Sequence, residues 1–97
     1  MAYPDFFAHL DTDSVAVAVK DVPAGSVTVA FLNGSDNRQA TANAEIPVGH
    51  KVALTDLAEG ADVIEYGERV GVTSAAITAG DHVHVHNIRS ARWHKDN

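Results

Sequence analysis

The chain has 97 residues, which is enough for one domain but leaves no material for a second core and disfavours a deep, enclosed active site. Its net charge of −6 and its seven scattered Lys and Arg residues argue against nucleic acid as a partner. It has no cysteine, which excludes disulfides, thiolate metal ligands and a Cys nucleophile and favours a cytoplasmic location. No signal-peptide pattern is present and no segment approaches the roughly 20 apolar residues of a membrane span, so we expect no membrane association.

Segments rich in β-branched residues follow one another along the chain, and they predict an all-β fold. The expected strands, in chain order, are residues 6–10, 15–19, 26–32, 38–42, 51–54, 62–66 and 82–86. The polar run 33–37 predicts a hairpin loop between two of them. Helix signals are weak throughout.

Four short segments share one pattern, in which an apolar residue is followed three positions later by glycine: 22–25, 46–49, 57–60 and 77–80. Asp21, Glu45 and Asp56 directly precede the first three. Since glycine accepts positive φ without steric cost, each segment predicts a tight turn that leads into the next strand. Their irregular spacing excludes a solenoid of equal repeats.

Histidine is the residue type that points to function. On a strand at 82–86, His82, His84 and His86 would share one face while Val83 and Val85 would point to the core. Imidazoles two residues apart can bind a divalent metal, so His84 and His86 are candidate ligands, or they can act as acid, base or anion contact. The alternative is a solvated row of histidines with no specific role.

Other polar residues are candidates to join this face. His50 and Lys51 follow the turn at 46–49, where both side chains can meet an anion, and Asn87 can orient a ligand or cap the strand end. Tyr66 brings an aromatic hydroxyl into a loop-rich region with Gly67 and Gly71, although packing is the simpler explanation. His9 is expected to be structural. Hydrolase, nucleotide-binding and zincin motifs are absent from the sequence.

Three motifs in order carry a resemblance to a known family: GHK at 49–51, YG at 66–67, and HVHVHN at 82–87. Together with the flanking residues from about 6 to 93, the chain resembles the small SAF-type domain of the altronate and galactarate dehydratases, a family that includes the small subunit of sulfolactate sulfo-lyase. The resemblance implies a β-clip fold. We expect one SAF-like domain over residues 1–97, with its core at about 6–88 and a tail at 89–97.

The resemblance also implies a reaction, namely β-elimination from a hydroxy acid. On this basis His50, His84 and His86 are the expected catalytic residues, with Lys51, Asn87 and Tyr66 as substrate contacts. The family implies a divalent metal, with iron(II) expected, supplied largely by a larger catalytic subunit that shares the site. The substrate is a small anionic hydroxy acid.

Within the family, the short independent length and the tail favour a sulfo-lyase small subunit that releases sulfite from (2R)-sulfolactate to give pyruvate. A sugar-acid dehydratase of the altronate or galactarate type is the alternative, and a non-catalytic carbohydrate- or metal-binding module is a further one. A metal-binding homo-oligomer in which histidine strands from several copies meet is a third alternative. Arg89, Arg92 and Trp93 suit docking onto an acidic partner surface.

Overall fold

The computed structural model describes residues 3–84 and 86–90 of the chain. The prediction of an all-β fold is confirmed, because the described residues form strands and turns without a helix. The strands are β1 (Phe6–Ala8), β2 (Val15–Ala18), β3 (Gly25–Phe31), β4 (Arg38–Ala42), β5 (Lys51–Ala53), β6 (Asp62–Glu65), β7 (Glu68–Thr73), β8 (His82–Val83) and β9 (Ile88–Ser90). In this part of the chain no helix is long and apolar enough to cross a membrane.

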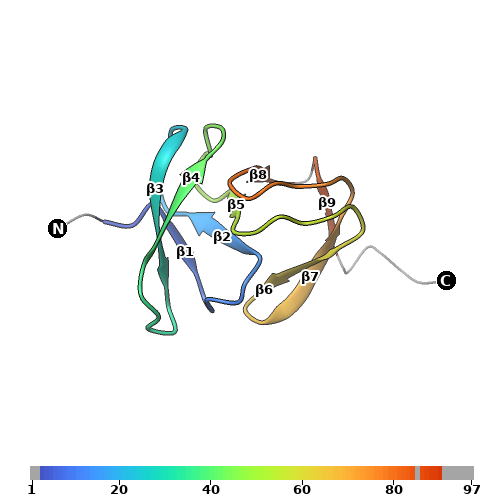
Figure 1. Cartoon of the computed structure of the whole chain (residues 1–97), viewed down its shortest axis with the longest axis horizontal. Helices are drawn as coiled ribbons and strands as arrows, with labels where there is room; N and C mark the ends of the chain where they lie inside the picture. Colours follow the sequence, from blue (N-terminus) through green and yellow to red (C-terminus); the bar gives the residue numbers. More distant parts are fainter. Residues whose placement is uncertain (1–2, 85, 91–97) are drawn as a thin grey trace.

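The strands form two sheets that lie side by side (Figure 1). The larger sheet has six strands in the order β4-β3-β1-β2-β5-β8, and only its β1–β3 pair is parallel. The smaller sheet has the order β6-β7-β9, with antiparallel pairs throughout. The predicted hairpin loop at 33–37 is confirmed between β3 and β4.

The core of this body consists of two hydrophobic clusters. One is built around Phe6, Val29 and Val52, and the other around Val15 and Val83, all of them fully or almost fully buried. Neighbouring residues on β2 and on β5 enter different clusters because strand side chains alternate between faces. The two clusters therefore share strands and belong to one body. Each buried Val or Phe stabilises the fold by about 1.5–3 kcal/mol.

The four predicted turns come together as two matching pairs. Val22 forms an isolated antiparallel bridge with Ile46, and Leu57 forms the same bridge with Ile77. In each pair an aspartate accepts a hydrogen bond from a backbone N–H two residues beyond the bridge. Its distance is 2.9 Å for Asp21 and Val48 and 2.8 Å for Asp56 and Ala79. The recurring sequence pattern is thus a structural duplication that closes each cluster at one end.

Two strands were missed by sequence reasoning, and the strands expected at 6–10 and 82–86 were predicted too long, the first of them ending as β1 at Ala8. The region expected to be loop-rich after Tyr66 is β7, and Gly71 lies inside it, paired with Val63 and Ser90. The tail was expected from residue 89, yet β9 continues to residue 90. The strand expected at 82–86 ends as β8 at Val83, and Val85 lies outside the described residues.

Candidate functional site

Strand pairing brings histidines from two distant parts of the chain together. β5 and β8 are antiparallel, with Lys51 opposite Val83 and Val52 opposite His82. Continuing this register by one residue places His50 opposite His84. The imidazoles of His50 and His84 stack with their centroids 3.8 Å apart. The structure therefore places His50 beside the HVHVHN motif, as predicted, while the roles of these residues stay predictions.

All four imidazoles of this region form one cluster, which we call the histidine cluster (His50, His82, His84 and His86). Nδ1 of His50 lies 2.8 Å from Nε2 of His82, which is a hydrogen-bond distance. The His82 ring is 5.1 Å from that of His86 and 5.9 Å from that of His84, measured between centroids. His82 was not among the predicted site residues, although it stands at the centre of these contacts.

The crowding of the imidazoles in the histidine cluster favours their neutral form. Partial burial, together with His50, His86 and His84, lowers the pKa of His82. Partial burial and the neighbouring His50, Lys51 and His86 likewise lower the pKa of His84. Within residues 3–84 and 86–90, neither the cluster nor Lys51 forms an ion pair with a carboxylate. An anion bound here would meet hydrogen-bond donors and one lysine without a competing negative charge.

Asn87 holds the loop that follows β8. Its Oδ1 accepts a hydrogen bond from the backbone N–H of His84 at 3.0 Å, and its Nδ2 donates to the carbonyl oxygen of His82 at 2.8 Å. The backbone N–H of Asn87 also donates to the carbonyl oxygen of His84. The side chain thus closes a turn. This turn explains why the strand stops at Val83 and why the histidines form a cluster instead of a row along one face of a longer strand. Its predicted contact with substrate is a separate matter that stays a prediction.

Tyr66 does not lie with the histidine cluster. It is in the turn between β6 and β7, which lies at the opposite edge of the molecule from β8 in Figure 1. Its ring contacts that of His9, with centroids 3.4 Å apart, and 55 % of the residue is exposed. Tyr66 has a φ of 61° and Gly67 a φ of 73°, so this two-residue hairpin turn has positive φ at both positions. For a tyrosine this backbone conformation costs about 1–2 kcal/mol.

A buried carboxylate supports this strained turn. Asp13 is only 4 % exposed and accepts backbone hydrogen bonds from Tyr66 and Gly67, both at 3.1 Å. It also accepts two at 3.2 Å from His9 and Leu10, so one side chain ties two loops together. The partners at 66–67 are distant in sequence, so no local pattern around Asp13 marks it for burial.

The predicted metal site is not completed by this chain's described side chains. Among residues 3–84 and 86–90, no three His, Asp or Glu side chains are placed to bind one metal ion. His50 Nδ1 and His82 Nε2 share a hydrogen bond with each other, so these two nitrogens are not both free to donate to a metal. A metal held by His84 and His86 would need ligands from elsewhere.

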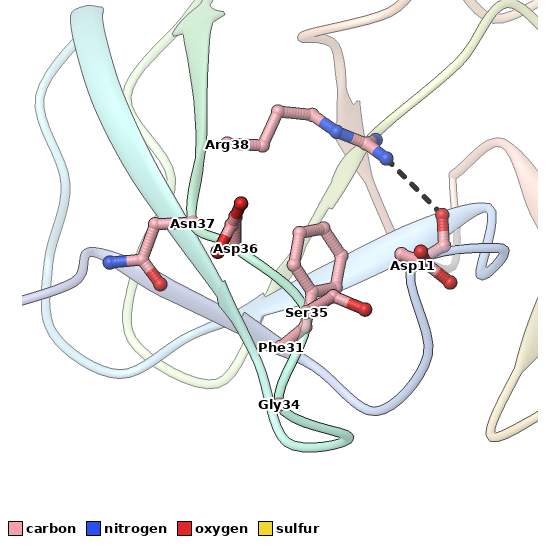
Figure 2. Close-up of a pocket in the computed structure, with 7 residues that line it drawn as sticks. All are labelled: Asp11, Phe31, Gly34, Ser35, Asp36, Asn37 and Arg38. Carbon is pink, nitrogen blue, oxygen red and sulfur yellow. Dashed lines mark hydrogen bonds between the residues drawn. The ribbon is translucent and has the colours of Figure 1, made fainter.

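A pocket of about 570 Å³ lies in the β3–β4 hairpin loop and is separate from the histidine cluster (Figure 2). Arg38 crosses it, donating to the carbonyl oxygen of Asp11 at 3.2 Å and lying 5.0 Å from the centroid of the Phe31 ring. The guanidinium therefore joins two loops instead of pointing freely into the pocket. Arg92 and Trp93, predicted to dock onto a partner, lie outside the described residues.

The fold and the motifs define a known class of domain. The chain belongs to the altronate/galactarate dehydratase SAF domain family, whose model matches residues 4–91. Subunit alpha of (2R)-sulfolactate sulfo-lyase from Chromohalobacter salexigens is 40 % identical over 91 residues, covering 92 % of this chain and 97 % of that protein. Altronate dehydratase from Escherichia coli K12 is 47 % identical over 79 residues, covering 80 % of this chain but only 15 % of that enzyme. The sulfo-lyase subunit alpha from Paracoccus pantotrophus is 48 % identical over 61 residues, covering 61 % of this chain and 91 % of that protein.

Proposed function

We propose that this chain is the small subunit of a two-component lyase that acts in the cytoplasm and releases sulfite from (2R)-sulfolactate to give pyruvate. The observation that carries the proposal is the histidine cluster, four imidazoles gathered beside Lys51 without an ion-pairing carboxylate in the described part of the chain. The match to the sulfo-lyase subunit alpha, which covers 92 % of this chain and 97 % of that protein, supports this substrate.

The reaction requires a base, a proton for the enol and groups that stabilise negative charge. A base removes the proton from the carbon that carries the hydroxyl and the carboxylate. The C–S bond then breaks, its electron pair leaves with sulfite, and the resulting enol of pyruvate takes up a proton to become the ketone. Donors and positive charge must stabilise the anion that develops on the carboxylate. His50, His84 and His86 would supply proton transfer or donors at such an anion, and Lys51 would attract it.

The larger subunit would complete the site. The histidine cluster is partly exposed and lies at the edge strand β8 of the six-stranded sheet, where a second polypeptide can reach it. A divalent metal, with iron(II) expected, would supply Lewis acidity to the complete enzyme and would take most of its ligands from that partner. The isolated small subunit would then be inactive.

A dehydratase acting on altronate or galactarate is the second candidate. The identity of 47 % to altronate dehydratase supports it, since that value is similar to the 48 % found over a shorter segment for the sulfo-lyase subunit of Paracoccus pantotrophus. The same site chemistry would apply, with water instead of sulfite as the leaving group.

The test is to co-purify the chain with the large lyase polypeptide encoded nearest to it and to assay three substrates in parallel. Release of sulfite and pyruvate from sulfolactate is expected. Formation of 2-keto-3-deoxy acids from altronate or galactarate would assign the dehydratase function instead. If no partner binds and no substrate turns over, the lyase proposal is wrong and a binding module becomes the better description.

A further inference from the structure

The hydrogen bond between His50 and His82 has a direction, and the direction decides what His50 can do. Nδ1 of His50 and Nε2 of His82 are 2.8 Å apart, so one of them carries the hydrogen and the other accepts it. In the first arrangement His82 donates through Nε2–H and both rings carry their hydrogen on Nε2. In the second, His50 donates through Nδ1–H and both rings carry it on Nδ1.

The intrinsic preference of imidazole favours the first arrangement. A neutral imidazole side chain prefers to carry its hydrogen on Nε2, and the first arrangement satisfies this preference in both rings, whereas the second satisfies it in neither. Each arrangement leaves one N–H without a hydrogen-bond partner among residues 3–84 and 86–90, Nε2–H of His50 in the first and Nδ1–H of His82 in the second, so the tautomer preference decides between them.

We infer that His82 is a positioning residue that donates to Nδ1 of His50 and thereby fixes the free Nε2 of His50 as a hydrogen-bond donor. His50 then recognises an oxyanion of the substrate, a carboxylate or sulfonate, and does not remove the C–H proton. The base must be a different group. This inference deepens the proposed lyase function and, for the substrate, rests on it.

Two neighbouring histidines fix the orientation of the His50 ring. His82 holds one nitrogen in the ring plane, while the ring of His84 stacks on its face at 3.8 Å with an angle of 13° between the planes. Such fixed donors favour an anion because they need no reorganisation when it binds.

The first test uses nitrogen NMR of the isolated chain with EDTA at about pH 8.5, where free imidazoles are neutral. We expect a through-hydrogen-bond coupling between Nε2 of His82 and Nδ1 of His50, with the hydrogen on Nε2 of both rings. A hydrogen on Nδ1 of His50, or the absence of this coupling, would overturn the inference. The result does not depend on lyase activity, so it stands even if no substrate turns over.

Variants of His82 then separate positioning from folding. His82→Glu presents only an acceptor and should move the hydrogen of His50 to Nδ1, whereas His82→Gln retains a donor and should preserve Nε2–H. In the complex, His82→Glu and His82→Leu should lower kcat/KM for sulfolactate by about tenfold, the loss expected for one hydrogen bond, and His82→Gln should recover most of it. Equal activity of all three variants at unchanged melting temperature would refute the role of His82 while leaving the lyase function intact. Turnover of altronate instead of sulfolactate would refute only the substrate.

Discussion

Asp13 accepts a hydrogen bond from the backbone N–H of Tyr66 at 3.1 Å, across 53 residues of sequence. Asp13→Ala would remove the acceptor of four part-buried hydrogen bonds from backbone N–H groups. We expect a loss of at least about 3 kcal/mol in the free energy of unfolding, because each unsatisfied buried donor costs about 1–3 kcal/mol. Urea unfolding measures this, with Asp36→Ala on an exposed loop as the control. A loss as small as that of the control would show that the carboxylate contributes little.

Because the backbone at Tyr66 is strained, we expect the glycine variant to be more stable than the alanine variant, which reverses their usual order of stability. Both Tyr66→Ala and Tyr66→Gly lose the contact with His9, but only alanine keeps a Cβ at a φ of 61°. The glycine variant should therefore be more stable by about 1 kcal/mol, although glycine ordinarily costs 0.5–1 kcal/mol, roughly, relative to alanine. Thermal unfolding of the two variants decides between them.

Tyr66→Phe separately tests the predicted substrate contact, since loss of the hydroxyl should raise KM only if that contact exists.

Gly80 and Gly60 provide a matched pair among the four turns. Both have positive φ, at 92° and 82°, so alanine is strained at either position. A Cβ at Gly80 would overlap the carbonyl oxygen of Thr41, whereas a Cβ at Gly60 meets nothing within 4 Å. Gly80→Ala should thus cost more than Gly60→Ala by about 1–3 kcal/mol, the range for overpacking. Equal melting temperatures would mean that β4 moves aside without cost.

The lowered pKa values of His82 and His84 predict that stability falls in mild acid. Below the usual imidazole pKa of about 6.5 the unfolded chain binds protons that the native cluster resists, so acid favours unfolding. The stability that depends on the neutral imidazoles is fully present above that pH, and it is lost as the pH falls through the lowered pKa values of the native state. With EDTA present, the melting temperature should decrease from about pH 7.5 to pH 5. The decrease should be smaller in the His82→Gln/His84→Gln variant, and an identical decrease would count against the cluster as its cause.

The predicted catalytic residues are separable from the fold. His84 is half-buried and His86 is exposed, and neither side chain fills either hydrophobic cluster. The His84→Ala/His86→Ala variant should therefore abolish turnover by the complex and change the melting temperature of the small subunit only slightly. Glu59→Gln, on an exposed turn, is the control for both measurements. A sharp loss of stability would show that these histidines are structural.

Much of the fold was readable because its signals are local. The four turns each contain an apolar residue and a glycine that takes positive φ, and these requirements act within a few residues of the chain. The strands β2 to β6 were predicted to within a residue or so for the same reason, since β-branched residues and alternation mark them directly. β7 was missed although it contains Val70, Val72 and Thr73, because Gly71 interrupts this run, and β9 is only three residues long, so pairing with neighbours decides that both are strands.

The sequence by itself determined an all-β chain, its turns and the motifs that place it in its family. Tertiary structure alone decided which side chains meet. The register of β5 and β8 sets His50 against His84, the side chain of Asn87 ends β8 and gathers the histidines, and Asp13 reaches a turn far along the chain. The contacts of His50 with His84 and of Asp13 with the turn at 66–67 join residues that are distant in sequence, so they depend on the path of the whole backbone and on pairing that no local pattern records.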